Sequence, residues 1–135
     1  RSGPERFLSS FRVFVELVRI CGDSPSPHQA AAIGRIASHF MTLRRMSLSV
    51  AGMLEAGKDV SVEAALVKEL GNNFEKLLPE IARLVVPDLS AVDPDKQRLF
   101  RETFEETLML SPSFTLRGGT REIMRGVIAR GLGLR

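Results

Sequence analysis

Residues 26–54 read SPHQAAAIGRIASHFMTLRRMSLSVAGML, and this stretch decides the fold. Ser26 is a good helix N-cap, Pro27 suits the first helical position, and Gln29 can complete a capping box. The apolar residues that follow at helical spacing are Ile33, Ile36, Phe40, Leu43, Val50 and Leu54. The stretch therefore predicts one long amphipathic helix, which ends at Gly57 and must bury its apolar side against other helices.

The segments on both sides show the same helical spacing. A first helix is expected from about Pro4 to Cys21. Its apolar face is formed by Phe7, Phe11, Phe14 and Val18. A third helix is expected from Asp59 or Ser61 to about Val86. Its apolar stripe is formed by Leu66, Leu70, Phe74, Leu77, Ile81 and Leu84. Pro79 lies inside this stripe and should kink or split the helix, because proline has no N–H to donate.

Two further helices complete the chain. Asp93 followed by Pro94 predicts the start of a fourth helix, and Pro112 ends it. A last helix is expected from Thr120 to about Leu132. The sequence has no strand-like alternation and no internal repeat. We therefore predict an all-α fold with one domain over residues 1–135: an antiparallel up-down four-helix bundle with an additional C-terminal helix packed across it.

Composition narrows the class of protein. Of the 135 residues, 44% are hydrophobic and 26% are charged, which is ordinary for a globular domain. No apolar run approaches about 20 residues, so no membrane span is expected. The net charge of +3 permits anion binding, but Trp and Tyr are absent, so nucleic-acid binding is the weakest of the functions considered. The single cysteine, Cys21, fits a reducing, cytoplasmic compartment.

The residues that precede the last helix form the most informative motif. Gly118 and Gly119 run into Thr120, a good N-cap, and a helix N-terminus offers free N–H groups to an anion or a polar cofactor edge. Arg117, Arg121 and Arg125 follow one another at intervals of four. These arginines form either a solvated face with acidic partners or a set of pyrophosphate ligands. His28 and His39 lack partners at metal-ligand spacing, so no metal is expected.

Several segments together resemble the C-terminal helical domain of acyl-CoA dehydrogenases. The block from Arg117 to Arg125, followed by an Ile-Ala-Arg at 128–130, resembles the family's Gly-Thr-x-Glu-Ile block. His28-Gln29-Ala30 resembles the start of the family's second bundle helix, and Glu5-Arg6 resembles the opening of its first. The sequence starts at Arg1 without a methionine, which fits a piece of a longer protein. The N-terminal helical domain and the middle β-domain of the family are absent from it.

The resemblance implies a flavoenzyme of fatty-acid metabolism. Such an oxidoreductase dehydrogenates an acyl-CoA at the α,β-position, passes a hydride to FAD and delivers electrons to an electron-transfer flavoprotein. Many members place the catalytic glutamate directly before the Gly-Thr pair, where this chain has Gly118. A minority supply it from the first bundle helix, where this chain has Glu5. The resemblance thus implies Glu5 as the catalytic base and Arg6 as a substrate contact. It implies flavin contacts from Gly118, Gly119, Thr120 and Glu122, and a homo-oligomeric enzyme.

Other interpretations of the same residues stay open. Glu5 and Glu122 are also typical first-turn acids, favoured by the helix dipole, and Thr120 is a cap in any case. The arginine and Phe-Gly that the family carries before His28 are missing, and Val85–Leu89 replace its Gly-Gly-x-Gly. The isolated chain is expected to be inactive and to retain no flavin. The alternative function is a non-catalytic oligomerisation or interaction module, which should expose a large apolar face.

Overall fold

The computed structural model describes residues 8–134, and over this range the chain is helical without a strand. The α-helices are α1 (Phe11–Cys21), α2 (Pro27–Glu55), α3 (Ser61–Val85), α4 (Pro94–Leu110) and α5 (Arg121–Gly131). Two short 3-10 helices, η2 (Leu89–Ala91) and η3 (Ser111–Thr115), lie on either side of α4. The predicted all-α fold is confirmed. Pro4 and Phe7, expected in the first helix, lie outside the described residues.

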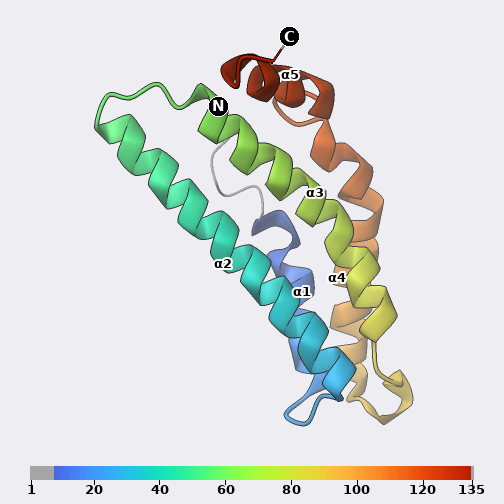
Figure 1. Ribbon diagram of the computed structural model, residues 1–135. Coiled ribbons are helices and arrows are strands. Elements are labelled where there is room, and N and C mark those ends of the chain that lie inside the picture. Colours follow the sequence, from blue (N-terminus) through green and yellow to red (C-terminus); the bar gives the residue numbers. More distant parts are fainter. Residues whose placement is uncertain (1–7, 135) are drawn as a thin grey trace.

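The long helices pack as a bundle with α5 across one end. Figure 1 shows the chain reversing direction between α2 and α3 and again between α3 and α4. Helix α3 packs against α2 on one side and against α5 and η3 on another, while α1 packs mainly on α4. Near its C-terminus α5 approaches α3 so closely that a Cβ atom on Gly131 would lie 2.0 Å from Val62 Cγ2. A glycine is needed there.

Side-chain caps start two of the helices as the sequence predicts. Ser26 Oγ accepts a hydrogen bond from the backbone N–H of Gln29, and Gln29 Oε1 accepts one from the N–H of Ser26, which completes the capping box. Gln29 also donates from Nε2 to the carbonyl of Val85 at 3.0 Å, so the start of α2 is tied to the end of α3. Asp93 caps α4 through the N–H groups of Asp95 and Lys96.

The core lies between α1, α2, α3 and α4. Its aromatic centre is the pair Phe40 and Phe74, whose rings meet edge to face with centroids 4.8 Å apart. The other buried members of this cluster are Val13, Leu17, Ile20, Ile36, Leu43, Leu78, Ala82, Val85 and Phe100. Helix α5 contributes no residue to the cluster, and none of its residues, all within the described range, is fully buried. It must therefore be held by other contacts.

The apolar stripe predicted for α3 is largely wrong. Leu66, Leu70, Leu77 and Leu84 are exposed, and only Phe74 of the predicted six is fully buried. The helix instead turns a different side inward, with Leu78, Ala82 and Val85 in the core. Several polar residues of α3 are also buried, because α3 packs against several other elements. The spacing of large apolar residues alone does not show which side of a helix faces which neighbour.

Of the kink or split expected at Pro79, the split does not occur. Helix α3 continues through Pro79, which is itself buried. Phe74 before it and Ala82 after it belong to the same core cluster, so interrupting the helix would cost core contacts on one side. These contacts outweigh the single backbone hydrogen bond that proline removes.

Two leucines six positions apart on α3 test this arrangement. Leu78 is 0% exposed and Leu84 is 73% exposed. We expect Leu78→Ala to lower the free energy of unfolding by about 2–5 kcal/mol, because it leaves a cavity in the core. Leu84→Ala should change it by less than about 0.5 kcal/mol. Urea unfolding followed by circular dichroism at 222 nm measures both. Equal losses would contradict the observed orientation of α3.

Candidate functional site

The described residues of the predicted site lie together in the turn that leads into α5. Gly118 has φ 66° and Gly119 has φ 109°, a left-handed conformation that favours glycine. A Cβ atom on Gly119 would also lie 2.9 Å from Met124 Cε. The turn therefore requires its two glycines for structural reasons, and Gly118 is exposed to solvent. Glu5 and Arg6 lie outside the described residues.

Lys68 of α3 binds the backbone of this turn, and the sequence analysis did not predict this contact. Its ammonium group donates hydrogen bonds to the carbonyl oxygens of Gly118 and of Gly119, the latter at 3.1 Å. Lys68 is only 8% exposed although it carries a charge. The sequence shows at this position only a lysine about two turns into α3. Most such lysines are solvated, so the signal did not distinguish it.

The three arginines flanking the turn all have acidic partners on α3. Arg117 Nη2 lies 3.4 Å from Glu75 Oε2, and Glu75 is 0% exposed. Arg121 Nε and Arg125 Nε lie 3.3 and 3.1 Å from the same oxygen, Glu69 Oε1. Of the two arrangements considered for these arginines, acidic partners are the one observed. The pairs attach the segment around the turn, residues 117–125, to α3.

Thr120 and Glu122 organise the first turn of α5 in an unexpected way. Thr120 occupies the N-cap position, but its side chain accepts no capping hydrogen bond, so the expected capping role is wrong. The pKa of Glu122 lies below its ordinary value because the carboxylate accepts a hydrogen bond from its own backbone N–H and then from Thr120. Nearby Arg125 and Arg121 lower that pKa further.

A polar pocket joins this region to the beginning of the described chain. Arg117 Nη1 donates to Ser9 Oγ at 3.2 Å, and its guanidinium lies over the ring of Phe114, 4.4 Å from the centroid. The pocket beside them has a volume of about 330 Å³. Its lining residues are Ser9, Arg12, Thr103, Glu106, Thr107, Leu110, Ser113, Phe114 and Arg117. Segments 108 residues apart in sequence thus meet next to Gly118.

A second, more apolar hollow of about 560 Å³ lies between α2 and α3. It is lined by residues that include Met46, Leu70, Phe74 and Leu77, and His39 stacks on Phe74 with centroids 5.0 Å apart. The exposed apolar side chains of these two helices are Met41, Leu48, Leu54, Leu66, Leu70, Leu77 and Leu84. The outer face of α2 and α3 therefore carries several large apolar side chains that are exposed to water.

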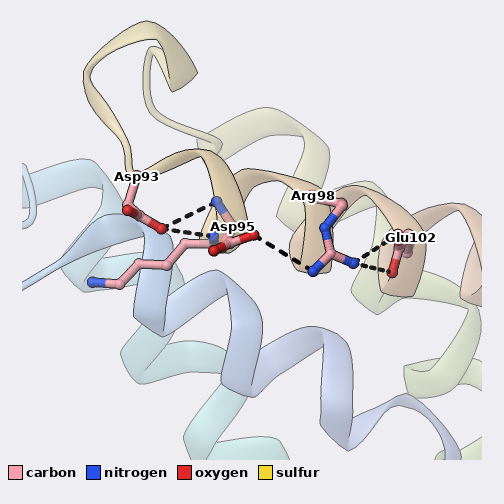
Figure 2. A network of polar contacts seen from close by, with 5 residues as sticks. Asp93, Asp95, Arg98 and Glu102 are labelled. Atoms are coloured by element: carbon pink, nitrogen blue, oxygen red, sulfur yellow. Dashed lines mark hydrogen bonds and ion pairs between the residues drawn. The ribbon is translucent and has the colours of Figure 1, made fainter.

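The remaining chemical groups show less organisation. Figure 2 shows ion pairs along α4, in which Arg98 lies between Asp95 and Glu102, all exposed. Such solvated pairs contribute little stability. Burial raises the pKa of the Cys21 thiol, which disfavours the reactive thiolate. Among residues 8–134 no three His, Cys, Asp or Glu side chains are grouped to hold a metal ion.

The chain matches no protein-family model, and neither curated proteins nor solved structures give a match. None of the helices described is long and apolar enough to cross a membrane. The functional argument therefore depends on the residues and contacts of this chain.

The shared carboxylate of Glu69 offers a test of how α5 is held. A buried charge-assisted hydrogen bond contributes about 1.5–3 kcal/mol, and partial exposure reduces that value. We expect Glu69→Gln to lower amide protection in α5 about tenfold while α1 and α2 keep theirs, as measured by hydrogen exchange. Glu80→Gln is the matched control, because Glu80 pairs with Arg83 on the exposed side of α3. Unchanged protection of α5 in Glu69→Gln would show that the apolar contacts of α5 suffice.

The lowered pKa of Glu122 predicts a pH dependence confined to the start of α5. Because its folded pKa lies below the ordinary value of about 4.3, ionised Glu122 stabilises the first turn above that pH. This contribution is lost as pH falls through the folded pKa. The amide protection of residues 120–123, measured as the intrinsic exchange rate divided by the observed rate at the same pH, should therefore be lower near pH 3 than at pH 6. Glu122→Gln should remove the difference, and its persistence in that variant would assign it to another group.

Proposed function

We propose that this chain is the C-terminal bundle domain of a flavin-dependent acyl-CoA dehydrogenase. The observation that carries the proposal is the contact between Arg117 and Ser9, which brings the start of the described chain to the glycine turn. Ser9 lies four residues after Glu5, so Glu5 is at most about 14 Å along the chain from Ser9. The Glu5 carboxylate therefore has the reach to serve a site at Gly118.

The turn also offers what a flat cofactor needs. Gly118 presents exposed backbone without a side chain, and the N-terminus of α5 starts directly beyond it. FAD, when bound, would accept the β-hydrogen of the acyl-CoA as a hydride. Within the chain, Glu5 would remove the α-proton, Arg6 would contact the substrate, and Gly118, Gly119, Thr120 and Glu122 would shape the flavin side of the site. A carboxylate base is most effective when burial lifts its pKa towards neutrality.

A second candidate is a non-catalytic interaction module, favoured by the apolar outer face of α2 and α3. The two functions differ in a simple observation. A preparation of the complete polypeptide that takes up FAD and shows flavin absorbance supports the enzyme. A complete polypeptide that stays colourless with FAD and self-associates through Leu70 and Leu77 supports the interaction module. Light scattering of Leu70→Ser and Leu77→Ser variants tests the second.

The base is tested by Glu5→Gln in the complete polypeptide that carries this chain. We expect FAD to stay bound and turnover of a saturated acyl-CoA to fall by at least about 10²-fold, the usual contribution of a positioned general base. Stopped-flow bleaching of flavin absorbance measures the step directly. Glu55→Gln, at the C-terminal end of α2, is the control and should leave turnover unchanged.

Placing a glutamate at position 118 in the Glu5→Gln variant gives a second test of the base. If Gly118 leaves room for the carboxylate of Glu5, then Glu5→Gln combined with Gly118→Glu should recover part of the lost turnover. The recovery should be incomplete, because a side chain at φ 66° is strained. Near-normal turnover in Glu5→Gln alone would remove Glu5 from the mechanism.

A further inference from the structure

We infer that Lys68 is the positioning residue of the proposed flavin site, an assignment that depends on the function proposed above. Lys68 lies one to two turns into α3, some fifty residues before the glycine turn in sequence, yet its ammonium group binds the carbonyl oxygens of both Gly118 and Gly119. A single buried cation therefore sets the orientation of two consecutive peptide groups.

The conformation of the turn makes this double contact possible. Both glycines have positive φ, and in this turn the carbonyl groups of both point to the same side, towards Lys68. Gly118 itself is exposed, so its backbone is accessible to a ligand. Without the ammonium group, these two carbonyls would lose a charged donor, and the glycines, which tolerate many backbone conformations, would no longer be held in one.

The surroundings of Lys68 separate its role from that of the ion pairs nearby. Glu69 binds Arg121 and Arg125, and Glu75 binds Arg117, so these acids attach the side chains on either side of the turn. Lys68 acts on the backbone of the turn itself. Positioning the turn and anchoring its flanks are thus carried out by different residues of the same face of α3.

The charge of Lys68 adds to its geometric role. Lys68 is 8% exposed, so its positive charge is only weakly screened by water. Hydrogen bonds to a cation polarise the peptide groups of the turn and strengthen their N–H groups as donors on the opposite side. A ligand edge that carries partial negative charge, such as the carbonyl and ring nitrogens of a flavin, is favoured there.

Lys68→Met tests the inference in two measurements, with Lys76→Met, an exposed lysine on the same helix, as the matched control. In the first, hydrogen exchange on the 135-residue chain should show residues 117–122 exchanging about tenfold faster in Lys68→Met, with circular dichroism unchanged. Lys68→Arg, which keeps a charged donor, should recover part of the protection. Unchanged exchange in this segment would overturn the inference.

The second measurement uses the complete polypeptide and FAD itself. Lys68→Met should raise the dissociation constant of FAD about tenfold while Lys76→Met leaves it unchanged, and Lys68→Arg should lie between them. A loosened turn with unchanged FAD affinity would overturn the positioning role and leave the proposed flavoenzyme intact. A wild-type polypeptide that binds no FAD would instead overturn the proposed function, and the inference with it. If Lys68→Met does not fold, Lys68→Arg and Lys68→Gln give the same comparison.

Discussion

The buried charged face of α3 is the constraint on which the rest of the C-terminal region depends. Lys68, Glu69 and Glu75 are all nearly inaccessible to water, and a charge in such a position is very unfavourable without a partner. Apart from Asn73, which donates to Glu69 Oε1, the partners described for them come from the short stretch between Arg117 and Arg125. This stretch must therefore lie on α3, and the course of the chain from η3 into α5 follows from that requirement.

The shape of the glycine turn follows from the same constraint. Gly118 and Gly119 both adopt positive φ, and in this turn the carbonyl groups of both accept a hydrogen bond from the one ammonium group of Lys68. Helix α5 then begins at Arg121, directly after Thr120, whose side chain makes no capping hydrogen bond. The interactions that hold the C-terminal region on α3 thus also shape the region proposed to meet the flavin.

Local features of the chain were predictable from sequence, whereas features that depend on distant partners were not. The capping box at Ser26, the cap at Asp93 and the start of α5 after Thr120 depend on residues within four positions of one another. The orientation of α3 depends on neighbours from several helices, so the spacing of its leucines predicted the wrong side as buried. The pairing of the arginines with Glu69 and Glu75 joins positions about fifty residues apart, and no local pattern indicates it.

The exposed leucines of α3 bear on both proposed functions without deciding between them. An acyl-CoA dehydrogenase domain needs other domains and subunits around it, and an interaction module needs a partner, so either would cover the outer face of α2 and α3. The glycine turn is different, because only the flavoenzyme uses its exposed backbone. Since Leu70 and Leu77 line the hollow between α2 and α3 while Gly118 lies beyond α4, assembly and cofactor binding can be altered by separate substitutions. The turn, and not the apolar face, therefore distinguishes the two functions.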